Sequence, residues 1–217
     1  MSRKNKISLY IAIGAFLAFI IWTALVCAFD VRAIGPQGSQ VGFATLNGFV
    51  HNITGVNMWL YMITDWLGLV PIAVSFGFAV LGLVQWIGRK NILKVDRDII
   101  ALGGFYVAVM ALYLFFEFAI INYRPVLIGG ILEASYPSST TVLVACVMST
   151  ASMQLHQRIK NKAIKLCVIF VIVGFVAFMV IGRLFSGVHW ASDIMGGVLI
   201  SISLVSAYAW VYDILKQ

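Results

Sequence analysis

Residues 164–181 read IKLCVIFVIVGFVAFMVI, a run in which Lys165 is the one charged side chain. A helix needs about 20 mostly apolar residues to cross the hydrocarbon core of a bilayer, so this run indicates a membrane-spanning helix. Similar apolar blocks recur on either side of it, at 7–29, 58–87, 99–121, 138–155 and 193–212. We therefore expect an all-α, polytopic membrane protein, a bundle of six transmembrane helices forming one membrane domain over 1–217.

The composition excludes an ordinary soluble domain. Hydrophobic residues make up 62% of the 217 residues and charged residues 11%, whereas soluble domains average about 45–50% and about 25%. The three cysteines, Cys27, Cys146 and Cys167, all lie inside apolar blocks, where a thiol behaves as a small hydrophobic group. We expect no disulfide, no metal site and no other cofactor.

The formal net charge of +7 is explained by topology. Lys and Arg are enriched in the loops of membrane proteins that face the cytoplasm. Twelve of the fifteen basic residues lie at the chain ends or in alternate connectors: Arg3, Lys4, Lys6, Arg89, Lys90, Lys94, Arg97, Arg158, Lys160, Lys162, Lys165 and Lys216. This pattern predicts that both termini are cytoplasmic, and it makes a nucleic-acid partner unnecessary. The sequence does not predict an oligomeric state.

The segment RLFSGVHWASD at 183–193 concentrates polar chemistry on the opposite side of the bundle. If its last part is helical, His189 and Asp193 lie one turn apart on the same face. Asp193 would then accept a hydrogen bond from one imidazole nitrogen and leave the other free as a nucleophile or base. The alternative is an interfacial histidine beside a capping aspartate.

Two further polar segments fall on the same predicted outer side. NYRP at 122–125 follows the third apolar block, and YPSSTT at 136–141 opens the fourth. A proline followed by hydroxyl residues favours a helix start, and the free N–H groups there form a natural anion site. A capped helix without a ligand is the alternative.

Together the three segments resemble the type 2 phosphatidic acid phosphatase family, whose motifs are K-x(6)-R-P, P-S-G-H and S-R-x(5)-H-x(3)-D. Arg124-Pro125 matches the end of the first motif, Pro137-Ser138 the start of the second, and Arg183, His189 and Asp193 the third at its full spacing. The resemblance covers about residues 7–212 and includes six spans with a site at the outer face.

The resemblance implies a metal-independent mechanism. In the family, the histidine corresponding to His189 attacks phosphorus to form a phosphohistidine, and the aspartate corresponding to Asp193 orients it. The phosphate would be bound by groups from all three motifs: Arg124, Ser138, Ser139 and Arg183. We therefore expect an integral protein of a bacterial-type plasma membrane whose partners are the bilayer and a lipid phosphate on its extracytoplasmic side.

Four positions depart from the family pattern. Gly182 replaces a serine, and Ser139 replaces a glycine. Glu117 stands where the family has a lysine, seven residues before Arg124 and so on the same face if the helix continues. It either pairs with Arg124 and holds it, or lowers the affinity of the site for a dianionic phosphate.

Thr140 replaces the family histidine that protonates the leaving group, and a threonine hydroxyl is too weak an acid for that task. A diphosphate needs no such acid because it releases a stable phosphate anion, so the substitution favours an isoprenyl diphosphate such as undecaprenyl diphosphate. His51 is a candidate substitute acid, or an ordinary loop histidine. The alternatives are a weak or silent relative that binds a lipid phosphate or a partner without cleaving it, and a transporter.

Two features remain open between function and structure. Asp65 lies in the second apolar block, where an intramembrane acid suggests a functional site but also permits a structural hydrogen bond. The connector 30–57 has apolar residues at helical spacing, as in an interfacial amphipathic helix or a packed loop helix.

Overall fold

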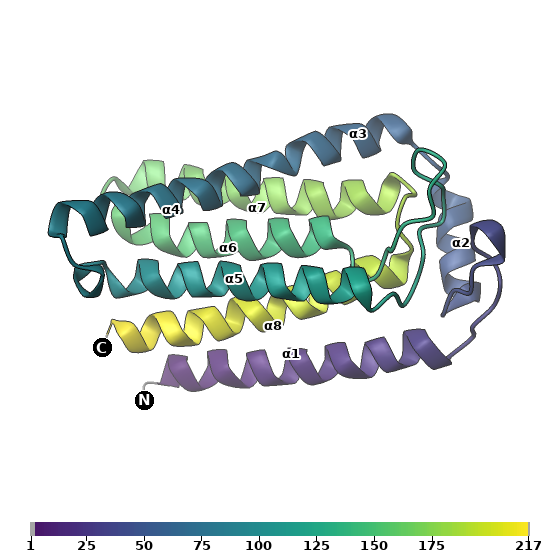
Figure 1. Cartoon of the computed structure of the whole chain (residues 1–217), viewed down its shortest axis with the longest axis horizontal. Helices are drawn as coiled ribbons and strands as arrows, with labels where there is room; N and C mark the ends of the chain where they lie inside the picture. Colours follow the sequence, from purple (N-terminus) through teal and green to yellow (C-terminus); the bar gives the residue numbers. More distant parts are fainter. Residues whose placement is uncertain (1–2, 217) are drawn as a thin grey trace.

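The computed structural model describes residues 3–216, and for residues 3 and 4 only the backbone. Long helices run side by side; the connectors from α4 to α5 and from α6 to α7 are short, whereas those after α1 and α5 are longer (Figure 1). They are α1 (Arg3–Ala28), α3 (Met58–Leu67), α4 (Leu69–Arg89), α5 (Arg97–Phe118), α6 (Ser139–Arg158), α7 (Lys162–Phe185) and α8 (Ala191–Leu215). The connectors contain η1 (Pro36–Gly38), α2 (Ala44–Thr54) and η2 (Ile92–Lys94). The all-α prediction is confirmed for the described residues.

Five helical segments of the described chain are long and apolar enough to cross a membrane: α1 from Asn5, the joined α3 and α4, α5, α7 and α8. The block predicted as a span at 138–155 forms α6, which is not among them. α6 packs against α4, α5, α7 and α8 and buries polar side chains such as Thr150 and Gln154. A helix enclosed by other helices faces protein rather than lipid, so polar side chains can serve as contacts between helices. A count of six spans therefore remains a prediction.

The segment from Met58 to Arg89 bends where α3 passes into α4 at Gly68. Pro71 lies in the first turn of α4 and cannot donate the backbone hydrogen bond that would continue the helix from α3. The bend has a consequence for the site, because α3 packs against α7 whereas α4 packs against α5 and α6.

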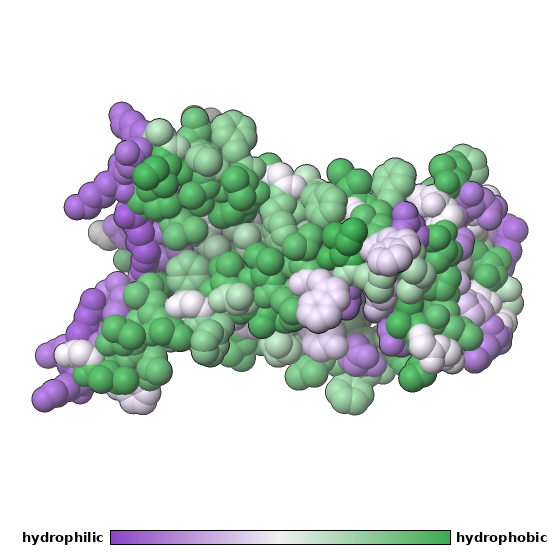
Figure 2. All heavy atoms as spheres, turned by 90° about the horizontal axis from the view of Figure 1, so that it is seen from above, coloured by the Kyte–Doolittle hydropathy of each residue, from purple (hydrophilic) through white to green (hydrophobic). Residues whose placement is uncertain are grey.

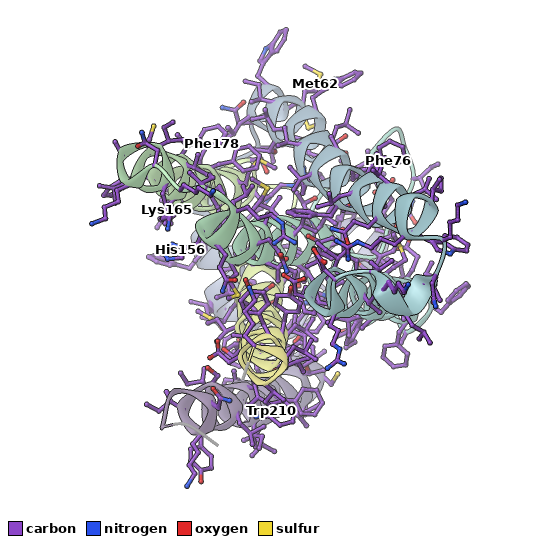
Figure 3. All side chains as sticks on the ribbon, turned by 90° about the vertical axis from the view of Figure 1, so that its left-hand side faces the viewer. Met62, Phe76, His156, Lys165, Phe178 and Trp210 are labelled. Carbon is purple, nitrogen blue, oxygen red and sulfur yellow. The ribbon has the colours of Figure 1, made fainter. Side chains whose placement is uncertain are left out.

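The surface of the bundle is apolar along its middle. Polar residues gather at the two ends, with an apolar belt between them (Figure 2). The start of α1, the end of α8 and the two basic connectors share one end (Figure 1). Viewed from that end, Met62, Phe76 and Phe178 lie at the periphery of the bundle (Figure 3), and all three are exposed. This belt suits contact with lipid tails.

The connector 30–57 contains a helix, α2, that is fixed to the start of α8. The buried Asn47 side chain donates to the Ser192 hydroxyl at 2.8 Å and accepts from the Ser192 backbone N–H at 3.0 Å. The opposite face of α2 exposes Leu46, Phe49 and Ile53. α2 therefore has an apolar face that no described residue covers, as an interfacial helix requires.

A buried tyrosine positions the chain that leads into α6. The Tyr136 ring packs against Phe19 of α1 and Phe116 of α5, with ring centroids 6.3 and 6.0 Å away. Its hydroxyl lies 2.6 Å from the hydroxyl of Thr23. Gly196 makes room for the ring, since a β-carbon there would lie 2.6 Å from it. Helices α1, α5 and α8 thus fix the position of residues 135–138 together.

Candidate active site

The three polar segments meet at the end of the bundle opposite the basic connectors (Figure 1). One is the loop after α5, one is the start of α6, and one joins the end of α7 to the start of α8. The loop after α5 folds back on itself, and Tyr123 and Ala134 pair as an isolated antiparallel bridge. Four distant parts of the sequence, including α3, contribute side chains to this end.

His189 and Asp193 are connected through Ser135. The Ser135 hydroxyl lies 2.9 Å from His189 Nδ1 and donates to Asp193 Oδ2 at 2.5 Å. The expected direct hydrogen bond between His189 and Asp193 is therefore wrong. Its premise fails because α8 begins at Ala191, so His189 precedes the helix and is not one helical turn from Asp193.

The Asp193 carboxylate is fully buried and compensated by several hydrogen bonds. Oδ2 accepts from the Trp190 backbone N–H at 3.0 Å, which caps α8. Oδ1 accepts from the Asn122 side chain at 3.0 Å and from the Ser192 hydroxyl at 3.4 Å. Burying a carboxylate is costly unless such donors replace water. Asp193 thus both caps the helix and, through Ser135, contacts the imidazole.

His189 is buried, and its second ring nitrogen is unoccupied. Nε2 has no hydrogen-bond partner within residues 5–216. Burial lowers the pKa of His189 well below its usual range, and the positive charges of Arg124 and Arg183 lower it further. The imidazole is therefore neutral at pH 7, with a proton on one nitrogen and a lone pair on the other.

Arg183 in the last turn of α7 is 2% exposed and is held mainly from α3. Its Nη2 donates to Asp65 Oδ1 at 3.1 Å and to the Thr140 hydroxyl at 2.5 Å. Its guanidinium lies over the Tyr61 ring, 5.1 Å from the centroid. Asp65, which the sequence left open, is thus the ion-pair partner of Arg183.

Arg124 pairs with Glu133 across the loop after α5. Arg124 Nε lies 3.0 Å from Glu133 Oε2, and the Arg124 backbone N–H donates to the Glu133 carbonyl at 3.0 Å. Of the two alternatives considered for Glu117, the pairing with Arg124 is therefore wrong. α5 ends at Phe118, so Glu117 and Arg124 do not share a helix face. Glu117 remains exposed on α5.

Ser138 and Ser139 begin α6. Ser138 is buried, its backbone N–H donates to the Asp193 carbonyl at 3.0 Å, and its hydroxyl accepts from Thr141 at 3.1 Å. These bonds fix the start of α6 against the start of α8. The next two residues, Ser139 and Thr140, line a cavity.

The cavity lies among α4, α5 and α6 and has a volume of about 300 Å³. Ser135, Ser139 and Thr140 supply polar lining, and Glu117 also contributes. Much of the rest is apolar, with side chains such as Ile72, Val109, Met110, Leu112, Phe116 and Leu143. An apolar cavity that reaches a few converging polar groups has the character of a ligand site.

A sequence model of the PAP2 superfamily matches residues 101–216, more than half of the chain. The chain belongs to the PAP2 superfamily. The match runs from α5 to α8 and includes all three motif segments, whereas α1 to α4 lie outside it. No curated protein sequence matches the chain.

This PAP2 chain also resembles a solved structure over almost its whole length. The match is to the crystal structure of a transmembrane PAP2-type phosphatidylglycerolphosphate phosphatase from Bacillus subtilis, with a TM-score of 0.68 at 18% identity. The alignment covers 96% of this chain and 98% of that one. With its membrane-length helices, the PAP2 chain is an integral membrane member of the type 2 phosphatidic acid phosphatase family.

The other two histidines of this PAP2 chain lie in different places. The His51 ring on α2 packs against Trp190, with centroids 5.4 Å apart, and its Nε2 is buried without a hydrogen-bond partner among residues 5–216. His51 therefore contacts Trp190, the residue that follows His189 in the sequence. His156 lies in the last turn of α6, the end far from Ser139 (Figure 3).

Sequence reasoning missed several groups of this PAP2 site. Ser135, Asn122 and Glu133 all come from the loop between α5 and α6. Ser135 and Asn122 are polar residues next to recognised motifs, which was the one available signal. No pattern in the sequence pairs Glu133 with Arg124, because that contact depends on how the loop folds back.

Proposed function

We propose that this PAP2 protein is a lipid phosphatase or diphosphatase in which His189 Nε2 accepts the phosphoryl group. Three buried polar atoms carry the proposal, because none has a hydrogen-bond partner within residues 5–216: His189 Nε2, Arg183 Nε and Arg124 Nη1. They supply one lone pair for phosphorus and N–H donors for its oxygens. Arginine donors form strong, charge-assisted hydrogen bonds with phosphate.

The reaction proceeds in two transfers. Nε2 of His189 forms a bond to phosphorus while the bond from phosphorus to the leaving-group oxygen breaks, which produces a phosphohistidine. A water molecule then attacks phosphorus, the bond to Nε2 breaks, and inorganic phosphate leaves. Arg124 and Arg183 stabilise the charge on the phosphoryl oxygens in both transfers.

We further propose a lipid diphosphate as the preferred substrate, in the class of isoprenyl diphosphates such as undecaprenyl diphosphate. Thr140 provides no acid, and its hydroxyl oxygen accepts a hydrogen bond from Arg183. A diphosphate substrate releases a phosphate monoester, which leaves as a stable anion without protonation. The apolar cavity beside Ser139 offers room for the first part of a lipid chain.

The proposed site faces the extracytoplasmic side of a plasma membrane, and both chain ends face the cytoplasm. Support comes from the basic connectors, which lie at the end of the bundle opposite the connection from α7 to α8 (Figure 1). In this arrangement α6 is a sixth span and residues 1–217 form one membrane domain. A membrane-impermeant thiol reagent should label Arg32→Cys in intact cells. Labelling only after lysis would show that the protein has the opposite orientation in the membrane.

A binding protein that does not cleave its lipid is the second candidate. It is favoured by one observation, namely that both arginines already have carboxylate partners, Glu133 and Asp65. These pairs reduce the positive charge available to a phosphate. A buried, neutral His189 with a free lone pair on Nε2 favours the enzyme.

The deciding experiment measures inorganic phosphate released from matched lipid monophosphate and diphosphate by the purified protein, without added metal. We expect release from the diphosphate, and the same release from His156→Ala, a matched histidine variant at the far end of the bundle. Tight binding of both lipids without release would instead establish the binding protein.

Replacing Thr140 with histidine is expected to raise hydrolysis of the monophosphate about tenfold or more, and of the diphosphate much less. A positioned general acid contributes about 10²–10⁴-fold, and only the poor alkoxide leaving group needs one. Thr140→Asn is the control, because it also loses the threonine hydroxyl but supplies no acid. An equal change on both substrates would contradict the role given to Thr140.

The pH dependence provides another test. Burial and the charges of Arg124 and Arg183 disfavour the protonated imidazole and lower the pKa of His189, so the reactive neutral form persists below the ordinary value of 6.5. A hydrogen bond with Ser135 opposes this lowering of the pKa but is the smallest of the causes. We expect kcat/KM, corrected for the titration of the substrate, to show no acid limb near pH 6.5. A limb centred there would show that His189 titrates normally.

A further inference from the structure

Ser135 lies outside the motif residues that identify the family, yet it contacts both members of the histidine and aspartate pair. It is 2% exposed. Its backbone N–H donates to the Asn122 carbonyl at 2.9 Å, which fixes the loop segment that carries it. The side chain of the same Asn122 donates to Asp193. Ser135 is therefore held in place by the residue that also holds the carboxylate.

The direction of each hydrogen bond follows from which of the three groups, carboxylate, hydroxyl and imidazole, has a proton to donate. A carboxylate only accepts, so the single hydroxyl proton of Ser135 lies toward Asp193 Oδ2, 2.5 Å away. The hydroxyl oxygen is then free to accept from His189 Nδ1 at 2.9 Å. Nδ1 must carry the ring proton, which leaves the lone pair on Nε2.

Asp193 cannot readily replace Ser135 in this arrangement. Its Oδ1 accepts from Asn122 and Ser192, and its Oδ2 accepts from the Trp190 backbone N–H. These bonds hold the carboxylate at the start of α8, where it caps the helix. The carboxylate reaches the imidazole by way of the Ser135 hydroxyl.

We propose that Ser135 is a positioning residue that fixes His189 in the tautomer with a free Nε2 and transmits the charge of Asp193 to the ring. The inference rests on the proposed function. When Nε2 bonds to phosphorus the ring becomes cationic, and the chain from Nδ1–H through the Ser135 hydroxyl to the carboxylate stabilises that charge. The proton stays on Nδ1 throughout, so the attack by Nε2 needs no base to deprotonate the imidazole.

The first test compares three serine variants in the phosphate-release assay. We expect Ser135→Ala to lower kcat about 10- to 100-fold with little change in KM, by analogy with the cost of removing the hydrogen-bond partner that orients a metal-binding histidine. Ser135→Thr keeps the hydroxyl and should restore most of the activity. Ser203→Ala is the matched control, because Ser203 is also buried but donates to the Ala12 carbonyl, far from the site.

A double-mutant cycle tests whether Ser135 and Asp193 act as one unit. If Ser135 transmits the effect of Asp193, Ser135→Ala should cost little in a protein that already carries Asp193→Asn. Independent, multiplying losses would overturn the proposal. So would a Ser135→Ala protein with the kcat of the wild type.

A spectroscopic test separates this inference from the proposed function. Nitrogen-15 spectra of the labelled protein contain signals from three histidines, and His189→Asn identifies the signal of His189. We expect the unmodified protein to show protonated Nδ1 and unprotonated Nε2, and Ser135→Ala to show a mixture of tautomers. Protonated Nε2 in the unmodified protein would refute the inference. If phosphate release were absent but this tautomer pattern present, the proposed function alone would fail.

Discussion

Replacing His189 with alanine is expected to reduce phosphate release by about a thousandfold or more. His189 Nε2 is the buried nucleophile in the proposed mechanism. Its ring lies 2.9 Å from the Ser135 hydroxyl and near enough to Arg124 and Arg183 for their charges to lower its pKa. Removing a covalent nucleophile typically costs several orders of magnitude in kcat. The measurement is the single-turnover rate of phosphate release from the lipid diphosphate.

The controls for this experiment separate chemistry from folding. His156→Ala should keep the wild-type rate, and His189→Ala should elute in detergent as the wild-type protein does. Rapid acid-free quenching of the wild type with radiolabelled substrate should trap a phosphoramidate that acid releases. If His189→Ala retained both turnover and the trapped intermediate, the nucleophile would have to be another residue.

Replacing Arg183 with glutamine is expected to lower kcat/KM about a hundred- to a thousandfold. The loss should be that large because removing one donor to the charge that develops in the transition state typically costs this much. Arg183→Lys should recover only a small part, since an ammonium group lacks the planar set of donors that fits phosphate. Initial rates at several lipid diphosphate concentrations provide the values.

The ion pair between Asp65 and Arg183 gives a second possible reason for a loss of activity in Arg183→Gln, and a double variant can separate the two reasons. Without Arg183, the carboxylate of Asp65 would lack its ion-pair partner. The double variant Arg183→Gln with Asp65→Asn removes both charges. If the loss reflects phosphate binding, the double variant should remain as inactive as the single one. Recovery of activity would mean that the arginine mainly neutralises Asp65.

The fold could be predicted because the bilayer imposes one simple requirement on the sequence. Long apolar blocks must be helices, and their ends shifted by only a few residues in the structure, as in α7 at Lys162–Phe185 against the predicted 164–181. What the blocks could not show was the bend at Gly68, which directs α3 toward α7. Apolarity alone also could not reveal that α6 is enclosed by its neighbours.

The site could be predicted only as far as residue types and spacing carry it. The motifs indicated Arg183 and His189, and the structure brings them to the same end of the bundle. The predicted contacts were wrong where they assumed a continuous helix, as between Glu117 and Arg124. Pairs such as Asp65 with Arg183 join residues far apart in the chain, and periodicity contains no information on them.

The polarity of α6 has a consequence for how the protein is made. Its side chains include Thr150, whose hydroxyl lies 3.3 Å from that of Tyr106 on α5, and Gln154, which donates to the Tyr208 hydroxyl of α8 at 2.7 Å. Such a helix gains little from entering lipid alone, and a short connector joins it to α7, whose sequence is strongly apolar. We expect the translocation machinery to release α6 and α7 into the bilayer as a pair. The proposed site, which includes the start of α6, would then be completed only when α4, α5 and α8 have packed around that helix.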